Sequence, residues 1–137
     1  MNQHKYLRAY MAGITVPTIF LLIGVTVFCI ARYVYNFPAP IERVMVFPMA
    51  VVPNLWGLWN IFFVALPAGK RLSIGFHGAL LPFILGPLGI LLTRALDFRL
   101  PISSSGLFPV AALVALSAYY LVWKYIVGSL NQILGNA

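Results

Sequence analysis

Two asparagines inside an apolar stretch are the polar residues of this chain best placed to contact a ligand. Asn54 and Asn60 share one face of a helical wheel with Pro53 and Gly57. A carboxamide among apolar groups is costly unless it meets a hydrogen-bond partner, so we expect both asparagines to point into a bundle or across a subunit contact. Two interpretations stay open: hydrogen bonds that join helices, or contact with a ligand or a water-filled path.

His77 is the third candidate, because an ionisable group inside an apolar stretch is a functional suspect. It lies close to Lys70 and Arg71, so it could reach the membrane surface as an interfacial side chain. It could also be a proton-linked or hydrogen-bonding group at a subunit contact, or a ligand of haem or metal. The other histidine, His4, lies in a terminal tail, so ligation by two histidines on helices would need a second copy of the chain.

Catalytic motifs are absent from the sequence. Its two acidic residues, Glu42 and Asp97, lie in connections between apolar stretches and offer no inward pair for acid–base work. Cys29 stands alone, and no group of His, Cys or Glu has metal-binding spacing. We therefore expect neither an enzyme nor a bound metal or cofactor.

Composition places the chain among membrane proteins. The 137 residues are 62% hydrophobic and 8% charged, and the mean hydropathy is +0.96, whereas about a quarter of residues are charged in soluble domains. The net charge of +7 is spread over short connections rather than one basic surface, which argues against nucleic-acid binding. At about 20 residues per crossing, this length allows four helices in a single domain.

The sequence therefore predicts an all-α fold, an integral membrane four-helix bundle formed by residues 9–31, 44–66, 72–93 and 107–127. The second and third stretches each contain the pattern Pro-x4-Pro, at Pro48 and Pro53, then at Pro82 and Pro87. A proline inside a helix removes a backbone donor and clashes with the preceding turn, so we expect these two transmembrane helices to be kinked. The backbone groups freed by a kink need partners inside the protein or in a cavity.

Small residues predict where helices pack. In the third stretch they recur at steps of four and three and form what we term the small-residue seam: Gly75, Ala79, Pro82, Gly86 and Gly89. Aromatic residues gather at the end of the fourth stretch, where we expect an interfacial belt that includes Trp123 and Lys124. We expect residues 128–137, which are more polar, to leave the bilayer.

The distribution of basic residues bears on orientation. The side with both termini carries five basic residues and the other side four, which favours cytoplasmic termini. We therefore expect an integral protein of a bacterial inner membrane with both ends in the cytoplasm. Insertion in both orientations, as an antiparallel pair, stays open.

These features favour a homo-oligomeric carrier, a flippase-like protein or a narrow pore for a small neutral, anionic or lipid-like solute. The leading candidates for a substrate or pathway site are Asn54, Asn60, Pro53, Gly57 and His77. One alternative is a non-catalytic accessory or scaffold subunit of a larger membrane complex, with the small-residue seam as its docking face. Another is a haem or redox anchor that uses His77. In each case we expect membrane lipids as partners.

Overall fold

The computed structural model describes residues 4–38, 41–95 and 108–136. Every regular element in these ranges is a helix, which confirms the expected all-α class. Four helices are long and apolar enough to cross a membrane: Lys5–Tyr33, Ile41–Ala65, Ile74–Leu92 and Pro109–Ile133. We refer to these as spans one to four.

Span one is the single helix α1 (Lys5–Tyr33), and the other spans are divided into shorter elements. Span two consists of α2 (Ile41–Val44), the π-helical turn η1 (Met45–Met49) and α3 (Val52–Ala65). The 3-10 turn η2 (Ala68–Lys70) leads to span three, made of α4 (Ile74–Ala79) and α5 (Pro82–Ala95). Span four contains α6 (Phe108–Leu121), the π-helical η3 (Val122–Val127) and α7 (Gly128–Ile133).

The prolines of spans two and three have different local effects. Phe47, directly before Pro48, has an extended backbone with φ −145° and ψ 125°, because a proline disfavours the helical conformation of the residue before it. Pro82 begins α5 after the end of α4. Pro53 lies in the first turn of α3, where a backbone donor is not needed, and Pro87 lies within the continuous helix α5.

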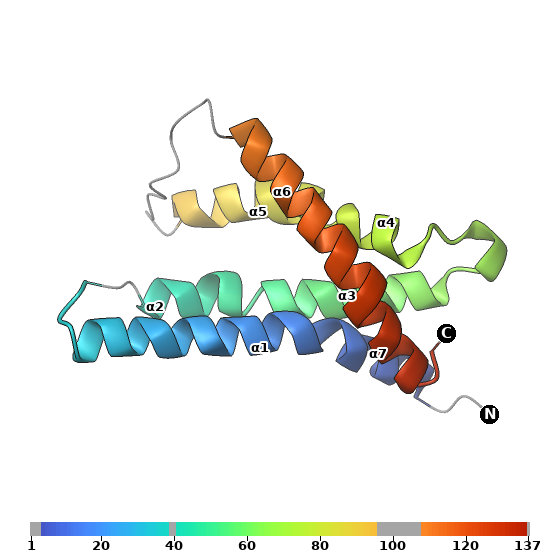
Figure 1. The fold of residues 1–137 in the computed structure, drawn as a ribbon, viewed down its shortest axis with the longest axis horizontal. Helices are drawn as coiled ribbons and strands as arrows, with labels where there is room; N and C mark the ends of the chain where they lie inside the picture. The colour runs from blue at the N-terminus through green and yellow to red at the C-terminus, as the bar shows by residue number, and fades with distance from the viewer. Residues whose placement is uncertain (1–3, 39–40, 96–107, 137) are drawn as a thin grey trace.

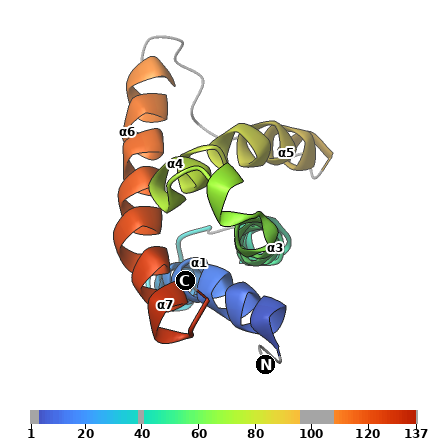
Figure 2. The same ribbon diagram turned by 90° about the vertical axis from the view of Figure 1, so that its right-hand side faces the viewer.

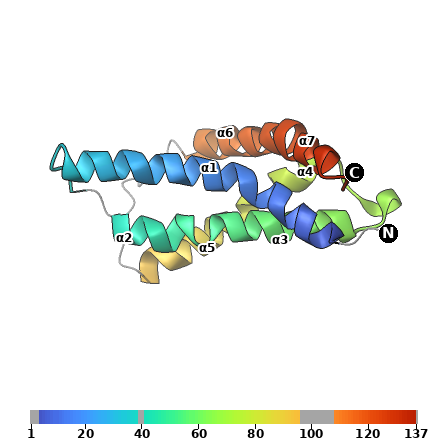
Figure 3. The same ribbon diagram turned by 90° about the horizontal axis from the view of Figure 1, so that it is seen from below.

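The spans form two layers that cross at an angle. The helix α1 runs antiparallel along α2 and α3 (Figures 1 and 3). The fourth span crosses this pair and packs on α4, while α7 at its end returns to α1, an arrangement seen along the long axis in Figure 2. Both ends of the described chain lie at the same end of the bundle as η2 (Figure 1).

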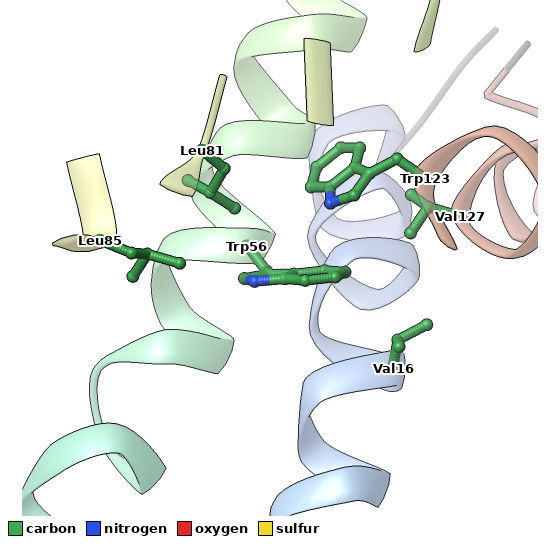
Figure 4. Packing of buried hydrophobic residues seen from close by; sticks show 6 residues of the cluster. All are labelled: Val16, Trp56, Leu81, Leu85, Trp123 and Val127. Carbon is green, nitrogen blue, oxygen red and sulfur yellow. The ribbon is translucent and has the colours of Figure 1, made fainter. Parts of the chain in front are cut away.

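One apolar core joins all four spans. It contains Val16, Trp56, Leu81, Leu85, Trp123 and Val127 (Figure 4). The rings of Trp56 and Trp123 lie 5.3 Å apart between centroids, within the range of favourable aromatic pairs. Trp123 is fully buried, so the expected place of this side chain in an interfacial belt is wrong. The i, i+4 spacing to the buried Val127 turns it inward.

Outside this core the bundle is open. The buried side chains of α1 all belong to its first half, from Ala9 to Pro17. In its second half Phe20 is 67% exposed and Ile23 58% exposed. Most of the apolar surface of the chain therefore faces its surroundings.

The tightest helix crossing lies between α1 and α3. A Cβ atom added at Gly13 would lie 2.5 Å from the Trp56 carbonyl oxygen and 2.8 Å from the Gly57 Cα. Backbones approach this closely only where a side chain is missing, as in the small-residue contacts of membrane helices.

Gly13→Ala should therefore destabilise the protein by about 1–3 kcal/mol, because the two helices must separate. Gly24→Ala is the matched control in the same helix, since a Cβ there meets no atom within 4 Å. Its effect should be neutral or slightly stabilising, as expected when Ala replaces Gly in a helix. Reversible unfolding in detergent measures both changes, and equal effects would contradict the close crossing.

Candidate functional site

Asn60 forms a closed carboxamide pair with Asn131. Asn60 Nδ2 donates to Asn131 Oδ1 at 2.9 Å, and Asn131 Nδ2 donates back to Asn60 Oδ1 at 2.9 Å. Asn60 Nδ2 also donates to the Ala9 carbonyl oxygen of α1 at 2.7 Å. Asn60 is fully buried and Asn131 is 2% exposed. These bonds therefore join α3, α7 and α1 at one buried point.

Helix periodicity explains why both side chains reach this point. Trp56, Asn60 and Val64 are buried at successive steps of four along α3. The buried Trp123 and Val127 continue at the same step to Asn131. Asn131 therefore extends the buried face of span four into α7, within the stretch 128–137 that we expect to leave the bilayer.

His77 is enclosed by aromatic rings. Its Nε2 lies 3.0 Å from the Trp59 carbonyl oxygen, and because a carbonyl only accepts, this nitrogen is the donor. The Trp59 indole Nε1 donates in return to the His77 carbonyl oxygen at 2.8 Å. The His77 ring stacks on Trp59 at 4.7 Å between centroids, and Phe62, Phe63 and Trp123 complete the enclosure. This reciprocal contact fastens α3 to α4.

Asn54 occupies a different environment. Its side chain is exposed, accepts a hydrogen bond from the Tyr10 hydroxyl and donates to the Ala50 carbonyl oxygen at 2.6 Å. Gly57 is buried against the Tyr10 ring and Ile14 of α1. Pro53 is half-buried in the first turn of α3. Asn54 and Gly57 accordingly belong to the α1–α3 contact.

The predicted site residues thus divide into separate contacts. Asn54 and Gly57 meet α1, Asn60 meets α1 and α7, and His77 meets the aromatic side chains of α3 and Trp123 of η3. The Asn60 carboxamide and the Nε2 of the His77 ring form hydrogen bonds within the chain. Their chemistry as observed is to hold helices together.

The small-residue seam meets several different neighbours. A Cβ at Gly75 would lie 2.7 Å from the Tyr120 ring, and one at Gly89 would lie 3.1 Å from the Phe47 ring. A Cβ at Gly86 would meet nothing within 4 Å. The middle of the seam, including Ala79 and Pro82, therefore borders open grooves instead of a packed helix.

Two apolar grooves lie between spans three and four. The first, of about 430 Å³, is lined by Pro82, Phe83, Gly86, Pro87, Ile90, Ala112, Ala115 and Leu116. The second, of about 490 Å³, is lined by Phe76, Ala79, Leu116, Ser117, Tyr120 and Leu121. They share Leu116, so they adjoin along α6. Small side chains on both walls make them concave.

Charged side chains lie near the ends of the spans. Arg32 and Glu42 form an ion pair of 2.7 Å between α1 and α2, at the end opposite the termini. At the end that holds the termini, Arg71 donates to two backbone carbonyls at the end of α3. Asp97, in the third connection, lies outside the described residues. In the described part of the chain, no three His, Cys, Asp or Glu side chains gather as a metal site would require.

The geometry defines a class of protein, an open bundle with four apolar helices of membrane-spanning length, an internal carboxamide pair and apolar grooves. None of the protein families, curated proteins and solved structures compared with the chain matches it. The functional argument therefore rests on the residues themselves.

The carboxamide pair gives the first test of these contacts. Asn60→Ala and Asn131→Ala should each destabilise the protein by about 1–3 kcal/mol, because each leaves a buried amide without its partner. The free energy of unfolding of the double variant should be close to that of the less stable single variant, because the hydrogen bonds between the two side chains can be lost only once. Chemical unfolding in detergent completes the double-mutant cycle.

Asn54→Ala serves as the control, because its side chain is exposed. Its effect should stay below about 1 kcal/mol, in the usual range for a single interhelical hydrogen bond. Additive losses for Asn60 and Asn131 would contradict a coupled pair.

Proposed function

We propose that this chain is an integral membrane protein that binds a lipid-like solute and moves it as a carrier or flippase-like protein. The observation that carries the proposal is the pair of adjoining apolar grooves between spans three and four. Four helices of membrane-spanning length and composition support insertion into a bilayer. In that setting the grooves would open toward acyl chains.

The polarity of the grooves selects the class of solute. Ser117 and the Tyr120 hydroxyl are the polar groups among their lining side chains. A small polar or ionic solute would lose its hydration there without gaining hydrogen bonds. The apolar part of a lipid would instead gain contact area, so a lipid-like solute fits better than the alternatives of a small anion or a water-filled pore.

The interruptions of spans two and three support a kinked bundle. The extended backbone at Phe47 interrupts span two, and hydrogen bonds from residue i+3 back to residue i replace part of the regular ladder between α4 and α5. We infer that spans two and three bend at Pro48 and Pro82 in the bilayer. A bend beside the grooves would let α5 move relative to α6 when a solute enters.

A homo-oligomer would complete the grooves. In the most apolar stretch of span one, 11% of the residues are buried, and the same share is buried in span four. Both spans therefore have a broad exposed face that a second copy could cover. A second copy placed across the open side would turn each groove into a covered path. The small-residue seam would then border the path.

An accessory subunit of a larger membrane complex is the second candidate. The observation that favours it is the second half of α1, where Phe20, Ile23 and Val27 are all more than half exposed. Purification of the chain only together with a defined partner would support this alternative over an independent carrier. A haem anchor gains no support, because His77 Nε2 already contacts the Trp59 carbonyl oxygen.

Filling the groove tests the proposed function. Gly86→Leu should lower lipid translocation by at least about tenfold, because the new side chain would occupy the space that a solute needs, as core filling does elsewhere. Translocation is measured with fluorescent lipids in vesicles that contain the purified chain, by loss of the inner-leaflet signal to an external quencher.

Gly24→Leu is the matched control. A Cβ at Gly24 also meets no atom within 4 Å, but Gly24 lies on α1, away from the grooves. Translocation by this variant should equal that of the unmodified chain. Equal loss in both variants, or no translocation by the unmodified chain, would overturn the proposal.

Membrane topology is tested separately. We propose an inner-membrane protein with both termini in the cytoplasm, which places Lys70 on the cytoplasmic side and Tyr35 on the other. In a Cys29→Ser background, Tyr35→Cys in intact cells should react with a membrane-impermeant maleimide. Lys70→Cys should react only after the membrane is opened. The reverse pattern contradicts the orientation, and labelling of both in intact cells contradicts a single insertion.

A further inference from the structure

A third concave site lies at the end of the bundle that holds the termini. It encloses about 310 Å³ between the start of α4 and α7, and it is lined by Phe63, Arg71, Leu72, Ser73, Ile74, Gly128, Asn131, Gln132 and Asn136. We call it the basal pocket. Unlike the grooves between spans three and four, it combines a cation, a hydroxyl and three carboxamides with apolar side chains.

Arg71 is held rigidly in the basal pocket. Its Nε donates to the Leu66 carbonyl oxygen at 2.6 Å, and its Nη2 donates to the Val64 carbonyl oxygen at 2.8 Å. The guanidinium carbon lies 5.4 Å from the centre of the Phe63 ring. These contacts use two of the five N–H groups of an arginine, so the others can donate to a ligand. A cation fixed in this way loses little freedom when it binds an anion.

The charge of this end of the bundle favours an anion. Lys70 lies next to Arg71, and the chain carries a net charge of +7. Glu42, the acidic residue in the described part of the chain, is paired with Arg32 at the opposite end. Among the described residues, no Asp or Glu side chain lines the basal pocket.

The other lining groups match a phosphate ester rather than a bare ion. Ser73 and Gln132 are exposed and carry donors at the rim, where they can reach phosphate oxygens. Leu72, Ile74 and Phe63 supply apolar surface beside them. The pocket lies between the predicted ends of spans two and three, at the depth where lipid headgroups would be found.

We propose that the basal pocket binds the phosphate of an anionic lipid headgroup, with Arg71 as the charged ligand and Ser73 and Gln132 as hydrogen-bond donors. The site rests on the proposed membrane insertion and is independent of lipid translocation, because it lies apart from the grooves. Arginine suits this role because its planar fork can donate two parallel hydrogen bonds to phosphate oxygens.

The test compares two neighbouring cations. In native mass spectrometry of the full chain in detergent, Arg71→Gln should weaken retention of phosphatidylglycerol about tenfold, the effect of losing one charge-assisted contact. Lys70→Gln, which removes the same charge one residue earlier and does not line the pocket, should weaken it much less. Equal weakening would mean diffuse attraction to the basic surface, and the proposal would be overturned.

A second variant is needed because Arg71 also hydrogen-bonds to the end of α3, so Arg71→Gln could disturb folding. The double variant Ser73→Ala, Gln132→Ala keeps Arg71 and should still weaken phosphatidylglycerol retention by about threefold or more, as expected for two neutral hydrogen bonds. Unchanged retention in this variant would overturn the assigned site even if Arg71→Gln fails to fold.

Two further arms identify the source of the phosphate and separate this proposal from the proposed function. Inorganic phosphate should compete poorly with phosphatidylglycerol, because it has no apolar part to contact Phe63, Leu72 and Ile74. Equally strong binding of inorganic phosphate would overturn a lipid site in favour of a free anion. Arg71→Gln should weaken phosphatidylglycerol retention by the same factor in a Gly86→Leu background as in the unmodified chain, because Gly86 does not line the basal pocket. A smaller factor in that background would overturn a separate headgroup site, so loss of translocation and loss of headgroup binding can be told apart.

Discussion

The structure depends on the need to satisfy polar groups carried by α3. Trp59 and Asn60 are neighbours in sequence, yet their side chains leave the helix in different directions, because successive residues turn by about 100° around an α-helix. Trp59 exchanges hydrogen bonds with His77 of α4, and Asn60 exchanges them with Asn131 of α7. One turn of α3 thereby fastens three other elements, including α1 through the Ala9 carbonyl oxygen.

This constraint explains why a bundle with so little buried surface keeps one arrangement. In a bilayer the apolar faces gain little by leaving lipid for each other, so close packing and specific bonds must select the neighbours. The close crossing at Gly13 and Gly57 supplies the packing. The Asn60–Asn131 pair supplies specific hydrogen bonds. In another register of the helices these bonds would break, and the two amide groups would be left without partners.

The sequence predicted the parts of this arrangement that follow from composition and spacing. Hydropathy and length predict the all-α class and the four long apolar helices, because apolar stretches of this length suit few other structures. The sequence also indicated that Asn60 needs a partner, but it could not identify Asn131, since partner choice depends on how helices cross. The best sequence signal for Asn131 as this partner was the i, i+4 spacing from Trp123 through Val127 to Asn131. This spacing continues one helix face into a stretch that composition alone suggests is a polar tail.

The paired carboxamides inside the bundle and the apolar grooves between spans three and four lead to one functional argument. A carboxamide that served a polar solute would keep a donor or acceptor free, yet both amide groups of Asn60 and Asn131 are engaged with each other. The concave surfaces on which the proposals rest are the apolar grooves beside Gly86 and the basal pocket around Arg71. One suits an acyl chain and the other a charged headgroup, which is why we propose a lipid as the ligand.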